Sequence, residues 1–262
     1  NERYMHGYLT DLGVDNTLLT EHDREFLDEN GYLNLGKILS DAQLVKTQKR
    51  ISDLLQAEGQ AAGSELFDSK NIRHPKELGA DRLANLVNKG AVFDVFYTHP
   101  KVLAGVDHVL GSSFKLSSLN YRAAKPGDGL QNLHVDWHEA VKPGSYQVCN
   151  SIWLLDDFSK SNGATRIVPK THLSGALPEE VLENPLLPHP NEIYIEAEAG
   201  SVFLFNAHVW HGGTQNQTTR YRRCIHSYFC RRDQPQQLDQ AKHILNSTKD
   251  RIGPQGVYIL GI

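Results

Sequence analysis

The sequence predicts a mainly β protein with supporting helices, in which an antiparallel sandwich or jelly roll is backed by N-terminal helices. After residue 111, about six short segments rich in β-branched and aromatic residues are separated by turns containing Gly, Pro or Asn. Before residue 111, apolar residues recur at helical spacing. Because no repeat or linker divides the 262 residues, we expect one domain over 1–262: helical support (1–111), a β core (112–232) and a tail (233–262).

The helices are predicted from their end signals. Ser40 and Gln43 have the spacing of a capping box, which opens a helix. Another helix starts near Pro100, a favourable first-turn residue, and Gly111 can close it. The remaining helical expectations are 81–88 and 238–245, the latter followed by a turn at Gly253 and Pro254.

The strands are predicted from composition and from the turns between them. The segment 125–129, Lys-Pro-Gly-Asp-Gly, is a turn-rich break between two strands. The expected strands are 114–124, 146–155, 165–168, 192–196, 201–206 and 221–231.

Composition excludes several classes of protein. The 27 Lys and Arg against 31 Asp and Glu give a net charge of −4, which disfavours nucleic-acid binding. No stretch has the roughly 18 apolar residues that cross a bilayer. The first ten residues lack the apolar core of a signal peptide, so the default location is cytoplasmic. No obligatory protein partner is indicated, and three cysteines, Cys149, Cys224 and Cys230, read as buried thiols of a reducing compartment.

Two histidines and a carboxylate are the first chemical signal. His134 and Asp136 would share one face of a strand, although such a pair also occurs on ordinary surfaces. His211 follows the strand 201–206 and precedes two glycines. Two imidazoles and one carboxylate are the set that holds non-haem Fe(II) with open coordination positions. Only the fold can join His211 to the other two residues.

A basic strand and a turn motif follow. Arginine suits bidentate binding of a carboxylate, and alternation would put Arg220 and Arg222 on one face and Arg223 on the other. The alternative is a solvated edge strand. Asn162 and Gly163 mark a tight turn before a short strand that begins with Thr165.

The order of these motifs resembles the phytanoyl-CoA dioxygenase family. The motifs are His-Val-Asp, Trp-Leu-Leu-Asp-Asp, Asn-Gly-Ala-Thr-Arg-Ile-Val-Pro-Lys-Thr-His, Trp-His-Gly-Gly-Thr-Gln-Asn and Arg-Tyr-Arg-Arg. The likeness is close over 114–231 and loose over the N-terminal helices. It implies a double-stranded β-helix and an Fe(II)- and 2-oxoglutarate-dependent oxygenase, so the single domain is expected to be catalytic.

The resemblance assigns iron ligands and co-substrate contacts. The implied iron ligands are His134, Asp136 and His211. His211 is chosen over His208 because the family ligand stands directly before a Gly-x-x-x-Asn stretch. The arginine for the distal carboxylate of 2-oxoglutarate follows by about eleven residues, which is Arg222, with Arg220 as the alternative. Further implied co-substrate contacts are Thr165, Gln131 and Trp153, and His172 is expected to be a structural turn residue.

The expected reaction is oxidation of a C–H bond with release of succinate and CO2, using Fe(II), 2-oxoglutarate and O2; a need for ascorbate is left open. Because Asp136 is present, hydroxylation, desaturation, epoxidation or ring formation is favoured over halogenation. A small metabolite or natural-product intermediate is preferred over an acyl-CoA, since few basic residues remain for CoA phosphates. Candidate substrate contacts are Trp137, His138, Tyr121 and Asn150.

Two other functions stay open. A zinc hydrolase would use the same three ligands with Glu139 as general base. An inactive jelly-roll binding protein would keep the fold without the chemistry. The segment 173–190 is either a lid over the site or a plain surface loop.

Overall fold

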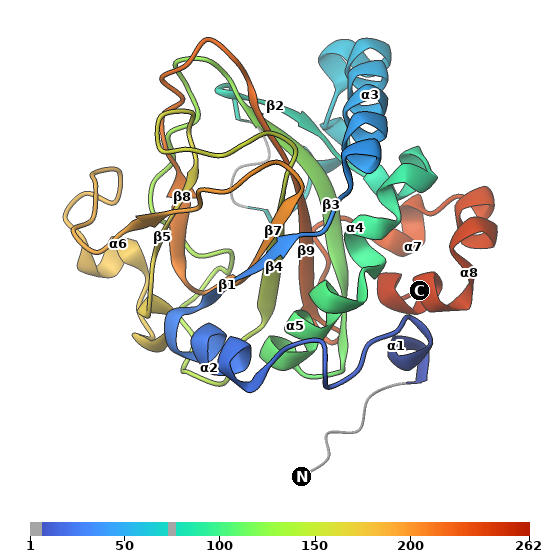
Figure 1. Cartoon of the computed structure of the whole chain (residues 1–262), viewed down its shortest axis with the longest axis horizontal. Coiled ribbons are helices and arrows are strands. Elements are labelled where there is room, and N and C mark those ends of the chain that lie inside the picture. The colour runs from blue at the N-terminus through green and yellow to red at the C-terminus, as the bar shows by residue number, and fades with distance from the viewer. Residues whose placement is uncertain (1–6, 73–76) are drawn as a thin grey trace.

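A computed structural model describes residues 7–72 and 77–262. Two antiparallel sheets face each other (Figure 1). The larger has the order β1 (Tyr32–Lys37), β7 (Ser201–Asn206), β4 (Val148–Leu154), β9 (Arg222–Arg231), β3 (Phe114–Ala124) and β2 (Ala80–Leu83). The smaller has the order β6 (Ile193–Tyr194), β5 (Thr165–Val168) and β8 (Trp210–Gly213).

The strands follow double-stranded β-helix topology. An isolated antiparallel bridge between His134 and His211 extends the smaller sheet beyond β8. From β3 the chain crosses to the smaller sheet at His134, returns in β4, crosses in β5 and β6, returns in β7, crosses in β8 and returns in β9. Strands β1 and β2 pair with β7 and β3 at the edges of the larger sheet. The jelly-roll expectation is therefore confirmed.

Helices cover the outer face of the larger sheet (Figure 1). One apolar cluster joins these helices to the outward side chains of β3, β4, β7 and β9. Alternation on each strand leaves the opposite side chains to face the smaller sheet. These helices are α1 (Gly7–Asp11), α2 (Glu21–Asn30), α3 (Asp41–Glu58), α4 (Val95–Thr98), α5 (Pro100–Leu110), α7 (Gln240–His243) and α8 (Asn246–Leu260). Helix α6 (Pro178–Val181) lies instead beside the smaller sheet (Figure 1). Short 3-10 turns lie at Gly59–Ala61, Ser64–Leu66, Leu86–Lys89, Ala91–Phe93 and Thr171–Leu173.

Elements with clear end signals are confirmed. Ser40 and Gln43 form both hydrogen bonds of a capping box at α3. Helix α5 begins at Pro100, and Gly111 caps it with φ 78°. Strands β3, β5 and β7 have the expected bounds. Strands β4 and β6 are each three residues shorter in total than expected, and β9 is one residue shorter.

One expectation about secondary structure is wrong, and two others need new detail. The segment 81–88 forms part of β2 and a 3-10 turn, because its first residues pair with the end of β3 and tertiary pairing overrides the apolar spacing. The first 111 residues are mostly helical, as expected, and they also include β1, which pairs with β7. In the tail, the expected helix is present but shorter, at Gln240–His243, and Gly253, with φ 64°, interrupts α8 at the place where the turn was expected.

The segment 173–190 is anchored to the smaller sheet. Fully buried Arg166 donates hydrogen bonds to the carbonyl oxygens of Pro185, Leu186 and Leu187. Leu177 and Leu182 pack against a small apolar cluster that includes Trp210. This anchoring favours a surface loop rather than a lid.

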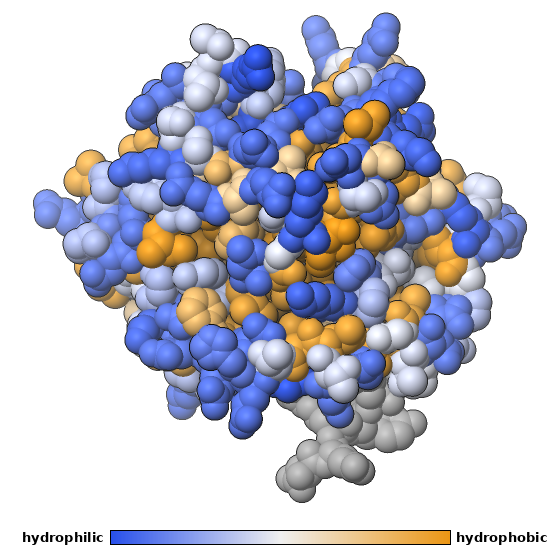
Figure 2. All heavy atoms as spheres, viewed as in Figure 1, coloured by the Kyte–Doolittle hydropathy of each residue, from blue (hydrophilic) through white to orange (hydrophobic). Residues whose placement is uncertain are grey.

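The surface is mixed in polarity. Figure 2 shows polar residues around the margins of one face and apolar residues gathered towards its middle. The three cysteines are buried and free, as expected. None of the described helices is both long enough and apolar enough to cross a bilayer.

Candidate metal and co-substrate site

His134, Asp136 and His211 come together between the two sheets. Asp136 Oδ1 lies 3.7 Å from His134 Nε2, and its Oδ2 lies 3.4 Å from His211 Nε2. All three ligand atoms lie within 4.8 Å of one another. The bridge between His134 and His211 explains this meeting, because two backbone hydrogen bonds of 2.9 and 3.0 Å fix the two residues side by side.

Backbone carbonyls orient both imidazole rings. Nδ1 of His134 lies 2.8 Å from the oxygen of Asn132, and Nδ1 of His211 lies 2.8 Å from the oxygen of Val209. A carbonyl oxygen can only accept, so each Nδ1 carries the proton and donates it. Each Nε2 therefore presents a lone pair to the common centre, which is the state that binds a metal.

Asp136 is fixed by three neighbours. Asn150 Nδ2 donates to its Oδ2 at 3.1 Å, the Tyr228 hydroxyl donates to its backbone oxygen, and its own N–H donates to Ala207. Burial opposes ionisation of this carboxyl, but His211, His134 and Asn150 outweigh burial and hold its pKa well below the ordinary value. The centre thus favours a cation.

The glycines after His211 allow a close backbone approach. A Cβ at Gly213 would lie 2.4 Å from the oxygen of Gly129, and one at Gly212 would lie 2.8 Å from the oxygen of Asn132. Only glycine fits there without a shift of β8 or of the segment leading to His134.

Arg222 is a fully buried cation on the inner face of β9. Its Nε and Nη2 have no hydrogen-bond partner among the described residues, and no described carboxylate lies within ion-pair distance. Its Nη1 lies 3.3 Å from Cys224 Sγ, and its guanidinium lies 4.5 Å from the centre of the Phe158 ring. Burial lowers its pKa from 12.5 to about 10. A buried guanidinium in this state fits an anionic ligand such as the distal carboxylate of 2-oxoglutarate.

The other arginines of this segment lie elsewhere. Arg220 is exposed and precedes β9. The expectation that it shares one strand face with Arg222 is therefore wrong. Arg223 forms a bidentate pair with Asp156. Arg222 is therefore better placed than Arg220 to bind an anion.

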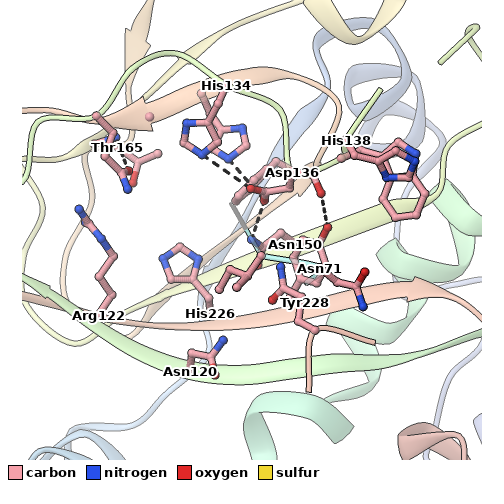
Figure 3. Close-up of a pocket in the computed structure, with 18 of the residues that line it drawn as sticks. Asn71, Asn120, Arg122, His134, Asp136, His138, Asn150, Thr165, His226 and Tyr228 are labelled. Atoms are coloured by element: carbon pink, nitrogen blue, oxygen red, sulfur yellow. Dashed lines mark hydrogen bonds and ion pairs between the residues drawn. The ribbon is translucent and has the colours of Figure 1, made fainter. Parts of the chain in front are cut away.

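A cavity of about 640 Å³ adjoins the three metal-ligand candidates (Figure 3). Gln131 and Thr165 line it, together with Trp137, His138 and Asn150. Thr165 stands opposite Gly213 in the pairing of β5 with β8, and Gln131 Oε1 accepts from the N–H of Gly213 at 3.0 Å. These side chains come together as the sequence predicts.

Two predicted pocket residues are on the wrong side of the sheet. Trp153 packs edge-on against Phe96 at 4.8 Å in the core beneath the helices, and its Nε1 donates to Ser151. It is an odd number of residues from Asn150 on β4, so strand alternation points it away from the cavity. Tyr121 lies in the same outer core. Glu139, the base a zinc hydrolase would need, is exposed and does not line the cavity.

A buried charge cluster was missed. Arg122, on the inner face of β3, binds Glu77 through Nε at 2.9 Å and Nη2 at 2.5 Å, and Arg82 on β2 binds the same carboxylate at 2.5 Å. Burial raises the pKa of Glu77, but Arg122 and Arg82 together lower it from 4.5 to about 2. Alternation along β3 was the one signal that could have placed Arg122 inside; Glu77 has no local signal.

His172 is a structural residue, as expected. Its Nε2 lies 2.9 Å from the oxygen of Asp28, and its ring packs against Tyr146. Its burial lowers its pKa.

Known proteins resemble this chain over most of its length. The family model described as phytanoyl-CoA dioxygenase matches residues 27–224. Dioxygenase af480 of Aspergillus fumigatus is 27% identical over 82% of this chain and 68% of its own, and human peroxisomal phytanoyl-CoA dioxygenase is 22% identical over 84% and 71%. The structure of HygX from Streptomyces hygroscopicus, with nickel and 2-oxoglutarate bound, superposes with a TM-score of 0.66 at 16% identity, covering 83% of this chain and 89% of that one. The chain therefore belongs to the phytanoyl-CoA dioxygenase family and is an iron- and 2-oxoglutarate-dependent dioxygenase.

Proposed function

We propose that this enzyme oxidises an unactivated C–H bond of a small polar metabolite or natural-product intermediate, with hydroxylation as the first expected outcome. His134, Asp136 and His211 hold Fe(II) in this proposal, and Arg222 holds the distal carboxylate of 2-oxoglutarate. The observation that carries it is the meeting of three ligand atoms within 4.8 Å, with both Nε2 lone pairs directed to one centre.

When bound, Fe(II), 2-oxoglutarate and O2 supply the oxidation, and succinate and CO2 are released. The protein's own contribution is to bind and to orient. Asn150 keeps the Asp136 carboxylate in place, and the carbonyls of Asn132 and Val209 keep the imidazole rings turned towards the metal. Thr165 and Gln131 line the same cavity as the three ligands and would contact the bound co-substrate.

The lining of the cavity supports a polar substrate over a fatty acyl chain. Its apolar side chains are limited to Ile72, Trp137, Phe205 and Pro235 among the described lining residues. A long alkyl chain needs a continuous apolar wall to repay its transfer from water. The acyl-CoA alternative is therefore the second candidate within the same reaction class.

Succinate formation by the purified protein tests the proposal. With Fe(II), 2-oxoglutarate and O2 but no substrate, we expect slow succinate release that depends on iron, and one compound of a small-metabolite library is expected to accelerate it. The His211→Ala and Asp136→Ala variants should lose both the slow and the accelerated reaction.

Metal identity provides the control. The protein loaded with Zn(II) should give no succinate, and calorimetry should show that 2-oxoglutarate binds only after a divalent metal has bound. Full iron-dependent turnover in His211→Ala would refute the assignment of the ligands. Hydrolase activity with Zn(II) alone, without any succinate, would refute the proposed reaction class.

A further inference from the structure

The inner face of the larger sheet carries a polar wall next to the metal-ligand candidates. Cross-strand pairing places Asn120 of β3 directly opposite His226 of β9, and Asn150 of β4 directly opposite Tyr228 of β9. All four residues line the cavity. Figure 3 shows this group below His134 and Asp136.

Asn120 has one buried atom without a partner. Ser118 donates its hydroxyl hydrogen to Gln237 Oε1 at 2.5 Å, so the same Ser118 oxygen accepts from Asn120 Nδ2 at 3.0 Å. The side-chain oxygen of Asn120 then has no donor among the described residues, although Asn120 is only 9% exposed. Asn120 thus keeps an unused acceptor.

Asn150 is in the same situation. The Asp136 carboxylate can only accept, so it fixes Asn150 Nδ2 towards itself. Oδ1 of Asn150 is left buried and without a donor, and the residue is 6% exposed.

His226 adds a third acceptor. The Cys224 thiol donates its hydrogen to the backbone oxygen of Arg122, so its sulfur, 3.4 Å from His226 Nε2, accepts from that nitrogen. Nδ1 of His226 then carries a lone pair, and it has no partner among the described residues. Burial and the charge of Arg122 lower the pKa of His226 to about 3, so the ring is neutral.

We infer that Asn120, Asn150 and His226 form an acceptor face that binds the hydroxyl groups of a polyhydroxylated small molecule, a sugar-like or cyclitol-like ring. Leaving three buried acceptors without donors is unfavourable, and a ligand rich in O–H groups satisfies them. This inference rests on the proposed function, because it names the substrate class of the same site.

The charges nearby select hydroxyl groups over ammonium groups. Arg122 and Arg82 share the one carboxylate of Glu77, so this end of the cavity has more positive than negative charge. A cationic amine would be repelled there, whereas a neutral hydroxyl donates without that cost.

Calorimetry on the full-length protein loaded with Ni(II) and 2-oxoglutarate tests the inference. The probes are myo-inositol and methyl glucoside, their fully O-methylated counterparts, and hexadecanoyl-CoA. We expect a hydroxylated probe to bind and its O-methylated counterpart, which has no O–H donor, to bind at least about fivefold more weakly. Asn120→Leu and His226→Leu should weaken binding of the hydroxylated probe by about fivefold to a hundredfold. Asn246→Leu, the same change on exposed α8, should leave binding and turnover as they are.

The outcomes separate the inference from the proposed function. Equal binding of hydroxylated and O-methylated probes, no binding of either hydroxylated probe at its solubility limit, or tighter binding of hexadecanoyl-CoA would overturn the substrate class. If Ni(II) and 2-oxoglutarate themselves do not bind, the proposed function fails and the inference with it. The comparison of probes uses the unaltered protein, so it decides the question even if a variant does not fold.

Discussion

Replacing Arg222 with methionine should separate the stability of the protein from its affinity for 2-oxoglutarate. Arg222 is buried without a carboxylate partner, whereas Arg122, on the adjacent strand of the same face, has Glu77. The same substitution at these two positions is therefore expected to change the free energy of unfolding in opposite directions.

The magnitude follows from the pKa of the buried guanidinium. A decrease from 12.5 to about 10 corresponds to a cost of about 3 kcal/mol for keeping Arg222 charged in the folded protein at neutral pH. Methionine removes that cost but loses the contact with Phe158, worth about 1 kcal/mol. We expect Arg222→Met to raise the free energy of unfolding of the ligand-free protein by about 1–2 kcal/mol. Arg122→Met leaves Glu77 with a weaker partner and should lower it by about 3 kcal/mol.

In the protein with 2-oxoglutarate bound, replacing Arg222 should be unfavourable rather than favourable. A charge-assisted, bidentate pair with a carboxylate contributes about 3 kcal/mol, so Arg222→Met should weaken 2-oxoglutarate binding by roughly 150-fold. The stabilisation that 2-oxoglutarate gives to the protein should disappear with it.

Urea denaturation and thermal unfolding, with Ni(II) and with or without 2-oxoglutarate, measure both effects. Arg220→Met is the matched control, because this exposed arginine should change neither quantity. If Arg222→Met still responds to 2-oxoglutarate, or destabilises the protein as much as Arg122→Met does, the assignment of Arg222 is wrong.

Three further predictions concern the surroundings of the site. Asn150→Leu removes the hydrogen bond to Asp136 and should weaken Ni(II) binding by about tenfold, measured by calorimetry; unchanged affinity would show that Asn150 does not position this ligand. Folding lowers the pKa of Glu77 from 4.5 to about 2, so ionised Glu77 stabilises the fold above pH 4.5 by about 2 kcal/mol after solvent screening, and this contribution is lost as the pH falls from about 4.5 to 2. Urea titrations should show that the free energy of unfolding of Glu77→Gln decreases less steeply over this pH range than that of the unaltered protein. An identical slope would contradict the charge cluster. Trp153→Phe should lower the free energy of unfolding by about 1–2 kcal/mol, because the smaller ring loses volume and the hydrogen bond to Ser151. The KM for 2-oxoglutarate should stay within about twofold. A large change in KM would show that Trp153 contacts the co-substrate after all.

Local sequence signals predicted most of the framework. The capping box at Ser40 and Gln43, the proline that starts α5 and the β-rich segments each depend on neighbours within a few residues, so their structure could be predicted without the fold. The spacing of His134 and Asp136, and the motif order around His211, also suggested the metal-ligand candidates. Strand β2 was missed because only its pairing with β3 makes it a strand.

By itself, the sequence determined the chemical types at the site and the residues that could supply them. The tertiary structure decided which side of a strand each residue faces. On β4, neighbouring positions point alternately into the cavity and into the core under the helices. The fold placed Trp153 in the core under the helices and Arg222 on the buried inner face of β9, and it left Arg220 in solvent. It also joined Glu77 to Arg122 across 45 residues. Such contacts are made only when the sheet closes, so they leave no local pattern in the sequence.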